Sequence, residues 1–331
     1  MNIIEADHLS KHFQVRKNFR GSLAFLRNLF THQYNQVRAV DEISFSIKVG
    51  EIVGYLGPNG AGKSTTIKML TGLLVPTSGE LTVDGFLPWR DRTRYVARIG
   101  AVFGQRTTLW WDLPVIESFE LLRHIYSISK SNFQNNLTEF TRLLDLDGFI
   151  DTPVRSLSLG QRMRADLCAA LLHNPKILFL DEPTIGLDVV AKERIRQFIL
   201  KINQQRGVTV LLTTHDLSDV EKLCERVMII DQGRLLFDGT LNFLSQKFSS
   251  KRRLVVDFAE VYSEFHIEGA EVVAMEGQQI TFQFERGLVT ASDLIGRISQ
   301  RYRIMDLQVL EPKIEDTIRR IYEERLLHSQ V

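Results

Sequence analysis

The sequence contains few cysteines and carries almost no net charge. Its 331 residues include two cysteines, Cys168 and Cys224. They form no metal-binding or redox spacing, so we expect both in the core of a protein from a reducing compartment. The 41 basic residues balance 40 acidic ones and leave a formal net charge of +1. Such a chain has no overall attraction for nucleic acid, and we expect no nucleic-acid partner.

Long apolar runs are also missing. No uninterrupted run approaches the roughly 20 apolar residues that cross a bilayer. The first 13 residues place Glu5, Asp7 and His8 among their apolar positions, which is not the pattern of a signal peptide. We therefore expect the chain to remain in the cytoplasm and to take part in any membrane process through a partner.

Acidic residues are absent from one stretch, between Asp7 and Asp41. We interpret residues 14–38 within it as an insertion between two strands, at 3–9 and 39–47. This insertion is either a solvated surface segment or a contact with lipid headgroups or a membrane subunit. The stretch has six basic residues: Lys11, Arg16, Lys17, Arg20, Arg27 and Arg38. A short basic amphipathic helix is predicted from four apolar residues at helical spacing: Leu23, Leu26, Leu29 and Phe30.

Strand-like runs alternate with helical stretches after this insertion, which is typical of a parallel α/β sheet. These runs lie at 52–56, 177–180, 208–212 and 227–230, and residues from about 90 to 172 are mostly helical. After residue 248 the pattern changes to short strands and two helices, which predicts a small α+β domain. The predicted strands lie at 253–259, 271–274, 279–284 and 304–310, and the helices at 291–302 and 314–327. We expect two domains, 1–247 and 248–331.

A glycine-rich segment has the spacing of a P-loop and lies between the strand at 52–56 and a helix at 65–73. It reads Gly57, Pro58, Asn59, Gly60, Ala61, Gly62, Lys63, Ser64. The glycines allow successive backbone N–H groups to surround an anion, and the helix N-terminus adds positive potential. We expect Lys63 to reach the β- and γ-phosphates of ATP, Ser64 to bind Mg²⁺ and Thr65 to add a phosphate contact. The alternative is a glycine-rich turn with an incidental lysine.

Two carboxylates, Asp181 and Glu182, end the apolar strand at 177–180. In a parallel α/β sheet, ligands bind at the carboxyl ends of the strands. Asp181 is therefore expected to hold Mg²⁺, directly or through water, and Glu182 to polarise a water for attack on the γ-phosphate. The alternative is that Asp181 only ends a strand.

A third segment reads Leu157, Ser158, Leu159, Gly160, Gln161, and a helix follows it. It stands in a series, in this order along the chain: the P-loop, Gln105, this segment, Asp181-Glu182, Gly186-Leu187-Asp188 and His215. The series resembles the ATP-binding subunit of ABC transporters over residues 2–247. The resemblance implies an α/β fold with a RecA-like parallel sheet, an antiparallel β subdomain and a helical subdomain, followed here by the small α+β domain.

The resemblance also implies roles for single residues. Gln105 would touch Mg²⁺ or the attacking water and sense the membrane subunit, and His215 would contact the γ-phosphate. Phe13 would stack on adenine; a lone phenylalanine can equally be a core residue. Asp188 would cross a dimer interface. The segment containing Ser158, Gly160 and Gln161 would meet the ATP held by another chain, where the family usually has glycine in place of Leu159.

Since the chain has one P-loop and one such segment, the resemblance implies two copies, identical or closely related, in a head-to-tail dimer. It also implies membrane-spanning permease subunits, which would place the chain at the cytoplasmic face of a bacterial membrane. Residues 309–318 resemble the C-terminal domain of type-2 ABC exporters, the branch of the daunorubicin-resistance ATPases. The run from Gly104 to Pro114 is similar to viologen-exporter-like proteins.

Trp110 and Trp111 follow Gln105 and are either an aromatic docking surface for the membrane subunit or ordinary packing. Two further functions remain open. One is the ATPase of an importer, and the other is a non-transport ABC protein that acts on ribosomes or DNA.

Overall fold

The computed structural model describes residues 1–16, 34–104, 106–248, 251–262, 264–285, 287–310, 317–319 and 321. The chain divides into two compact units, Met1–Gly239 and Thr240–Val331, and each is described by itself. The helix predicted from Leu23 to Phe30, the residue Gln105 and most of the helix predicted at 314–327 lie outside the described residues. Within the described ranges, none of the helices combines the length and apolar character that crossing a bilayer requires.

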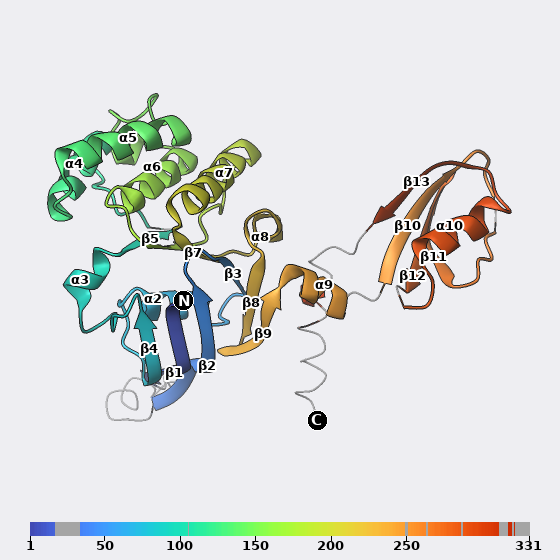
Figure 1. The fold of residues 1–331 in the computed structure, drawn as a ribbon, viewed down its shortest axis with the longest axis horizontal. Coiled ribbons are helices and arrows are strands. Elements are labelled where there is room, and N and C mark those ends of the chain that lie inside the picture. Colours follow the sequence, from blue (N-terminus) through green and yellow to red (C-terminus); the bar gives the residue numbers. More distant parts are fainter. Residues whose placement is uncertain are drawn as a thin grey trace, which may run out of the picture. The chain divides into compact units, whose positions relative to one another are not determined.

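The first unit begins with a three-stranded antiparallel sheet, in the order β2-β1-β4 (Figure 1). Its strands are β1 (Asn2–Arg16), β2 (Tyr34–Lys48) and β4 (Ser78–Val83). The strands predicted at 3–9 and 39–47 lie inside β1 and β2, which are longer. Their pairing continues to Arg16 opposite Tyr34, so both ends of the predicted insertion belong to this hairpin.

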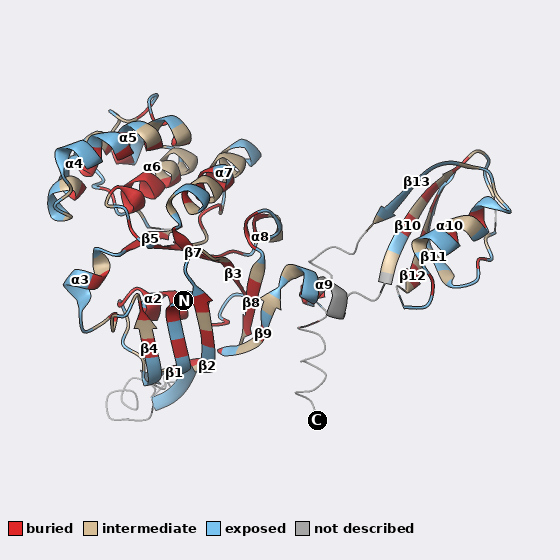
Figure 2. Ribbon diagram, viewed as in Figure 1, coloured by how far each residue is buried: buried red, intermediate tan, exposed pale blue. Residues whose placement is uncertain are grey.

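A six-stranded sheet forms the centre of the first unit, in the order β5-β6-β7-β3-β8-β9. The strands are β3 (Ile52–Leu56), β5 (Ile99–Phe103), β6 (Ile177–Asp181), β7 (Thr209–Thr213), β8 (Arg226–Asp231) and β9 (Arg234–Thr240). The first five in the sheet order run parallel. Their continuous apolar runs are buried (Figure 2), as expected for a parallel sheet that is covered on both faces.

Helices surround this sheet. Two short helices follow its strands, α2 (Lys63–Leu70) after β3 and α8 (Leu217–Leu223) after β7, and the short helix α3 (Arg92–Val96) precedes β5. Longer ones gather at one side of the unit: α4 (Val115–Ile125), α5 (Lys130–Leu144), α6 (Leu159–Leu171) and α7 (Val189–Arg206) (Figure 1). Between α5 and α6 lies one 3₁₀ turn, η1 (Val154–Ser156). Ser129 caps α5 through its side chain, and Gly207 ends α7 in the left-handed conformation, so the sequence itself sets these boundaries.

The second unit is a small antiparallel sheet with helices. It contains α9 (Leu241–Phe248), β10 (Lys251–Phe258), β11 (Ala270–Glu276), β12 (Gln279–Glu285), α10 (Ala291–Ser299) and β13 (Ile304–Leu310). The strand order is β11-β12-β10-β13. Phe258, Phe265, Phe282 and Tyr302 contact one another in its core. Gly277 turns β11 into β12 at a φ of +64°, a conformation that favours glycine.

Candidate functional site

The P-loop connects the buried strand β3 to the helix α2, and two of its glycines are required by close backbone contacts. A Cβ atom on Gly57 would lie 2.4 Å from the carbonyl oxygen of Ile230. A Cβ atom on Gly62 would lie 2.5 Å from that of Ala39, and Gly62 has a φ of +113°. Gly62 is also the N-cap of α2 and offers no side-chain cap. The N–H groups of the first turn are therefore directed at the loop, where an anion can accept from them.

Lys63 is the first residue of α2 and is buried, with 7% of its surface exposed. Its ammonium group donates to the carbonyl oxygens of Gly57, at 2.6 Å, and Pro58, at 3.2 Å. Burial lowers the pKa of Lys63, and the carboxylates of Glu182 and Asp181 oppose that shift. A phosphate in the loop would stabilise the charged form of this lysine further.

Ser64 and Asp181 bring two hard oxygen ligands together beside Lys63. Asp181 ends β6, and its Oδ1 accepts hydrogen bonds from the hydroxyl of Ser64, at 3.5 Å, and from that of Thr213. Thr213 ends the neighbouring strand β7. Hydroxyl and carboxylate oxygens suit Mg²⁺, which usually takes few ligands from protein and the rest from water and phosphate. The residues present therefore fit Mg²⁺ bound with ATP.

Glu182 lies directly after β6 and faces His215. Its Oε2 is 2.7 Å from Nδ1 of His215. The backbone of Glu182 has a φ of +57°, which is uncommon for a residue with a side chain and is concentrated at functional sites. Thr213 holds this conformation, because its carbonyl oxygen and its hydroxyl both accept from the N–H of Glu182, at 3.0 and 3.2 Å. The structure thus brings Glu182, the predicted base, into direct contact with His215, the residue predicted to reach the γ-phosphate.

Ser158 begins α6 and forms a reciprocal cap with Gln161. The Ser158 hydroxyl accepts from the Gln161 N–H at 3.2 Å, and the Gln161 side-chain oxygen accepts from the Ser158 N–H at 2.8 Å. Next to them, Leu159 packs against Gly186: a Cβ atom on that glycine would lie 2.9 Å from a methyl group of Leu159. The unusual leucine therefore faces the loop before α7.

Asp188 is the N-cap of α7, and its Oδ1 accepts from the N–H of Ala191 at 2.8 Å. The positions of Gly160 and Ala191 are neighbours, since a Cβ atom on Gly160 would lie 3.6 Å from that of Ala191. Ser158, Gly160, Gln161 and Asp188 therefore form a second cluster at the N-termini of α6 and α7. Within the described parts of the chain, their side chains form no hydrogen bond or ion pair with Lys63, Ser64, Asp181, Glu182 or His215.

Phe13 lies on β1, opposite Val37. The residue is 36% exposed, and the ammonium of Lys11 lies 5.4 Å from the centroid of its ring. Phe13 is thus not a core residue, and its exposed ring leaves room for a stacking partner.

A buried ion pair that the sequence did not predict joins the elements around the site. Asp219, on α8, is fully buried, and its Oδ1 accepts from Nε of Arg196, on α7, at 2.6 Å. The other oxygen accepts from the hydroxyls of Thr184 and Thr214. The pair thereby connects the segments that carry Glu182, Asp188 and His215. No sequence pattern indicates it, since Arg196 and Asp219 lie on separate helices. Thr213 could have been placed at the carboxyl edge of the sheet, because it directly follows the strand predicted at 208–212.

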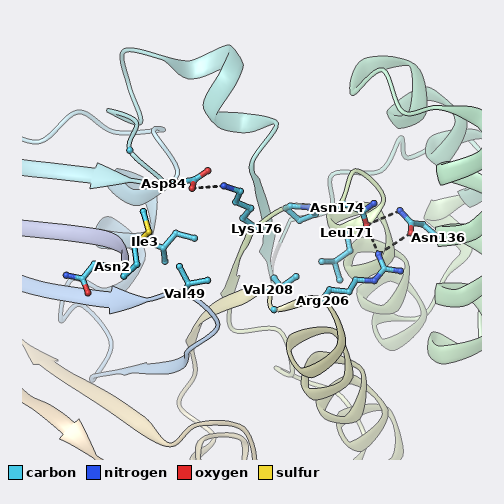
Figure 3. Close-up of a pocket in the computed structure, with 14 residues that line it drawn as sticks. Asn2, Ile3, Val49, Asp84, Asn136, Leu171, Asn174, Lys176, Arg206 and Val208 are labelled. Carbon is cyan, nitrogen blue, oxygen red and sulfur yellow. Dashed lines mark hydrogen bonds and ion pairs between the residues drawn. The ribbon is translucent and has the colours of Figure 1, made fainter.

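A cavity of about 790 Å³ lies elsewhere in the first unit (Figure 3). Lys176 and Val208 line it and directly precede β6 and β7, so it lies at the amino ends of strands whose carboxyl ends carry Asp181 and Thr213. Its charged side chains are already paired. Lys176 contacts Asp84 at 3.0 Å, and Arg206 donates to the side-chain oxygens of Asn136 and Asn174. This cavity is not the phosphate site.

Comparison with known proteins identifies the family. Residues 40–185 match the family described as "ABC transporter". The linearmycin resistance ATP-binding protein LnrL of Bacillus subtilis is 30% identical over 290 residues, which cover 85% of this chain and 93% of LnrL. The chain belongs to the ABC transporter family of ATP-binding proteins. The methionine import ATP-binding protein MetN of Geobacillus kaustophilus is 31% identical over 307 residues, covering 88% of this chain and 86% of MetN.

Solved structures of ABC proteins have the same fold. A dimeric post-hydrolysis state of the ATP-binding cassette MJ0796, bound to ADP and Pi, has a TM-score of 0.60 and 28% identity. The match covers 72% of this chain and 98% of that one. The predicted α/β ABC ATPase fold is thus confirmed. The chain is the ATP-binding subunit of an ABC transporter and contains an ABC ATPase domain.

Proposed function

We propose that this ABC transporter subunit is the ATP-hydrolysing motor of an exporter. The cluster in which Lys63, Ser64 and Asp181 lie beside the Glu182–His215 contact carries the proposal. Two relatives support a transport function, and the first of them, a resistance protein, supports export. LnrL is a resistance protein, and the bacitracin transport ATP-binding protein BcrA of Bacillus licheniformis is 34% identical over 217 residues, covering 66% of this chain and 70% of BcrA.

The first cluster binds the nucleotide. The backbone from Gly57 to Thr65 and the ammonium of Lys63 hold the phosphates, and the ring of Phe13 stacks on adenine. Ser64 and Asp181 hold Mg²⁺, together with Gln105. Bound Mg²⁺-ATP supplies the electrophilic γ-phosphate and a cation that offsets its charge.

Glu182 acts as the general base. Its carboxylate accepts a proton from the attacking water, and His215 orients that carboxylate through the contact at 2.7 Å. His215 also lies near the position of the γ-phosphate. The strained backbone at Glu182 is consistent with this role, because it fixes the carboxylate at the end of β6.

The second cluster completes the site of another chain. Ser158, Gly160 and Gln161 close over the phosphates that the partner holds, and Asp188 lies at the interface between the two copies. ATP binding then closes a head-to-tail dimer, and hydrolysis reopens it. Membrane-spanning permease subunits convert this cycle into transport at the cytoplasmic face of the bacterial membrane, where this chain is peripheral.

An importer is the second candidate, since MetN of Geobacillus kaustophilus is as similar to this chain as LnrL is. Purification of the full-length chain from its native cells, in mild detergent, tests the transport function that exporter and importer share. Membrane proteins that copurify support transport, and their removal is expected to lower ATP turnover. Copurification with ribosomes instead of membrane proteins would contradict the proposal.

A further inference from the structure

Asp166 is a buried carboxylate that has no role in the proposed hydrolysis of ATP. It lies in the middle of α6, two turns after Ser158, and is 4% exposed. A carboxylate is rarely buried to this extent unless hydrogen bonds compensate for the loss of water. Its partners therefore indicate what it does.

These partners belong to the loop that follows Gln105. One oxygen of Asp166 accepts three hydrogen bonds: from the Thr107 hydroxyl at 2.9 Å, the Thr108 N–H at 3.0 Å and the Thr108 hydroxyl at 3.1 Å. The Thr107 hydroxyl also accepts from the N–H of Leu109, at 3.1 Å. A single carboxylate oxygen thus holds Thr107 and Thr108, and Thr107 in turn holds Leu109.

The far end of the same loop is attached to the segment just before α6. The N–H groups of Val154 and Arg155 donate to the carbonyl oxygens of Leu113 and Trp111, both at 3.0 Å. Arg155 also contacts the carboxylate of Asp112 at 3.0 Å. Residues 106–114 are therefore held at both ends by residues 153–166, the segment that contains Ser158.

We infer that Asp166 is a positioning residue that makes the loop 106–114 and the Ser158 end of α6 move as one body. The inference rests on the proposed function. The loop presents Trp110 and Trp111, which are 38% and 50% exposed, as a docking surface for the membrane subunit. A displacement of these tryptophans then reaches Ser158, and so the ATP of the partner chain, through Asp166.

The negative charge of Asp166 is part of this connection. A carboxylate accepts hydrogen bonds more strongly than a neutral group does. Burial raises the pKa of Asp166 to about 6, against the hydrogen bonds from Thr108 and Thr107 and the charge of Arg162, one turn earlier on α6. The group is thus ionised at neutral pH and becomes neutral in mild acid, which weakens its hold on the loop.

The variant Asp166→Asn keeps the shape of the side chain and removes its charge. In the full-length chain we expect kcat for ATP to fall about tenfold at pH 8, with KM unchanged, because the P-loop is not altered. The difference from the original protein should shrink as pH falls through about 6, because Asp166 then becomes neutral. Asp147→Asn, at an exposed position outside the loop, is the matched control and should leave kcat unchanged.

Hydrogen exchange provides a readout that does not depend on activity. In Asp166→Asn, amides of the loop at 107–109 and of the Ser158 region should both exchange faster, although Asp166 contacts only the former. Thr107→Val combined with Thr108→Val should have the same effect, since it removes two donors and keeps the carboxylate.

The stability of the variant shows whether Asp166 positions the loop or is needed for folding. Because the pKa of Asp166 is raised in the folded state, its ionisation costs stability as pH rises from about 4 to about 6. The unfolding midpoint of Asp166→Asn should therefore rise relative to the original protein across this window, although its kcat at pH 8 is the lower of the two. Unchanged kcat and exchange in Asp166→Asn would overturn the inference. If the original chain itself hydrolysed no ATP, the proposed function would fail, and the exchange result would still decide whether loop and helix are coupled.

Discussion

At the scale of the residue, the contact between Glu182 and His215 is the part of the site that bears most directly on chemistry. The two side chains come from the ends of adjacent strands, β6 and β7. The unusual φ of Glu182 is maintained by two hydrogen bonds to Thr213. The position of the carboxylate thus depends on the backbone of its neighbour strand as well as on its own side chain.

Replacing Glu182 by glutamine tests its proposed role as a general base. The amide keeps the size of the side chain but cannot accept a proton, so we expect ATP turnover to fall by about 10²- to 10⁴-fold. The affinity for ATP should stay within about threefold, because Lys63 and the P-loop backbone are unchanged. Phosphate release and equilibrium binding of ATP measure the two quantities. Glu225→Gln, at an exposed position in the same unit, is the control, and hydrolysis by Glu182→Gln at the original rate would refute the assignment.

Much of the candidate site could be predicted from single residues. Ligands bind at the carboxyl ends of parallel strands, and the residue that ends a strand can be identified in the sequence. This rule predicted that Asp181 and Glu182 lie near the P-loop. The place of Thr213 at this edge could have been predicted, but its contribution could not, since nothing in the residue type indicates that one threonine will support both a carboxylate and a strained backbone. Asp166 was missed because its partners precede it by almost 60 residues, so no local pattern connects them.

At the scale of the element, α7 and α8 are joined by the buried pair of Arg196 and Asp219. Removing one partner leaves an unpaired buried charge. We therefore expect Arg196→Met to lower the free energy of unfolding by about 3–5 kcal/mol, as measured by denaturation in urea at pH 7.

The double variant Arg196→Met with Asp219→Asn is the control for this pair. It removes both charges and keeps an oxygen that can accept from Thr184 and Thr214, so it should recover most of the lost stability. If the single variant were as stable as the original, the pair would not contribute as described.

Elements with strong periodicity were predicted well. The strands at 52–56 and 177–180 agree with β3 and β6 because continuous apolar runs mark buried parallel strands. The strands β1 and β2 were predicted too short, because their outer halves are exposed: Val15, Tyr34 and Val37 are all about half accessible to solvent. Without a buried face, the alternation that identifies a strand is lost among basic and polar residues.

At the scale of the whole molecule, the two clusters of the first unit belong to different sites. In the proposed dimer, Lys63 of one copy would act with Ser158 of the other. A mixture of Lys63→Ala chains and Ser158→Arg chains should therefore regain activity, because a mixed dimer contains one intact site. With equal amounts, random pairing predicts about a quarter of the original ATP turnover.

Each variant alone provides the control, and both should be nearly inactive at every protein concentration. A mixture no more active than its components would contradict a site that is shared between two chains and works by itself. Turnover by the original chain should also increase more steeply than protein concentration, as expected when association precedes hydrolysis.

The contact between Leu159 and Gly186 has a consequence for how related sequences vary. Two positions 27 residues apart share one small volume, so the residue allowed at either depends on its neighbour. Gly186 also has a φ of +70°, which asparagine tolerates and branched residues do not. Among relatives, a bulky residue at position 159 should occur with glycine at 186, whereas a glycine at 159 should permit asparagine there. We therefore expect the two positions to be inherited as a pair, and exchanging one of them between family members should require exchanging the other.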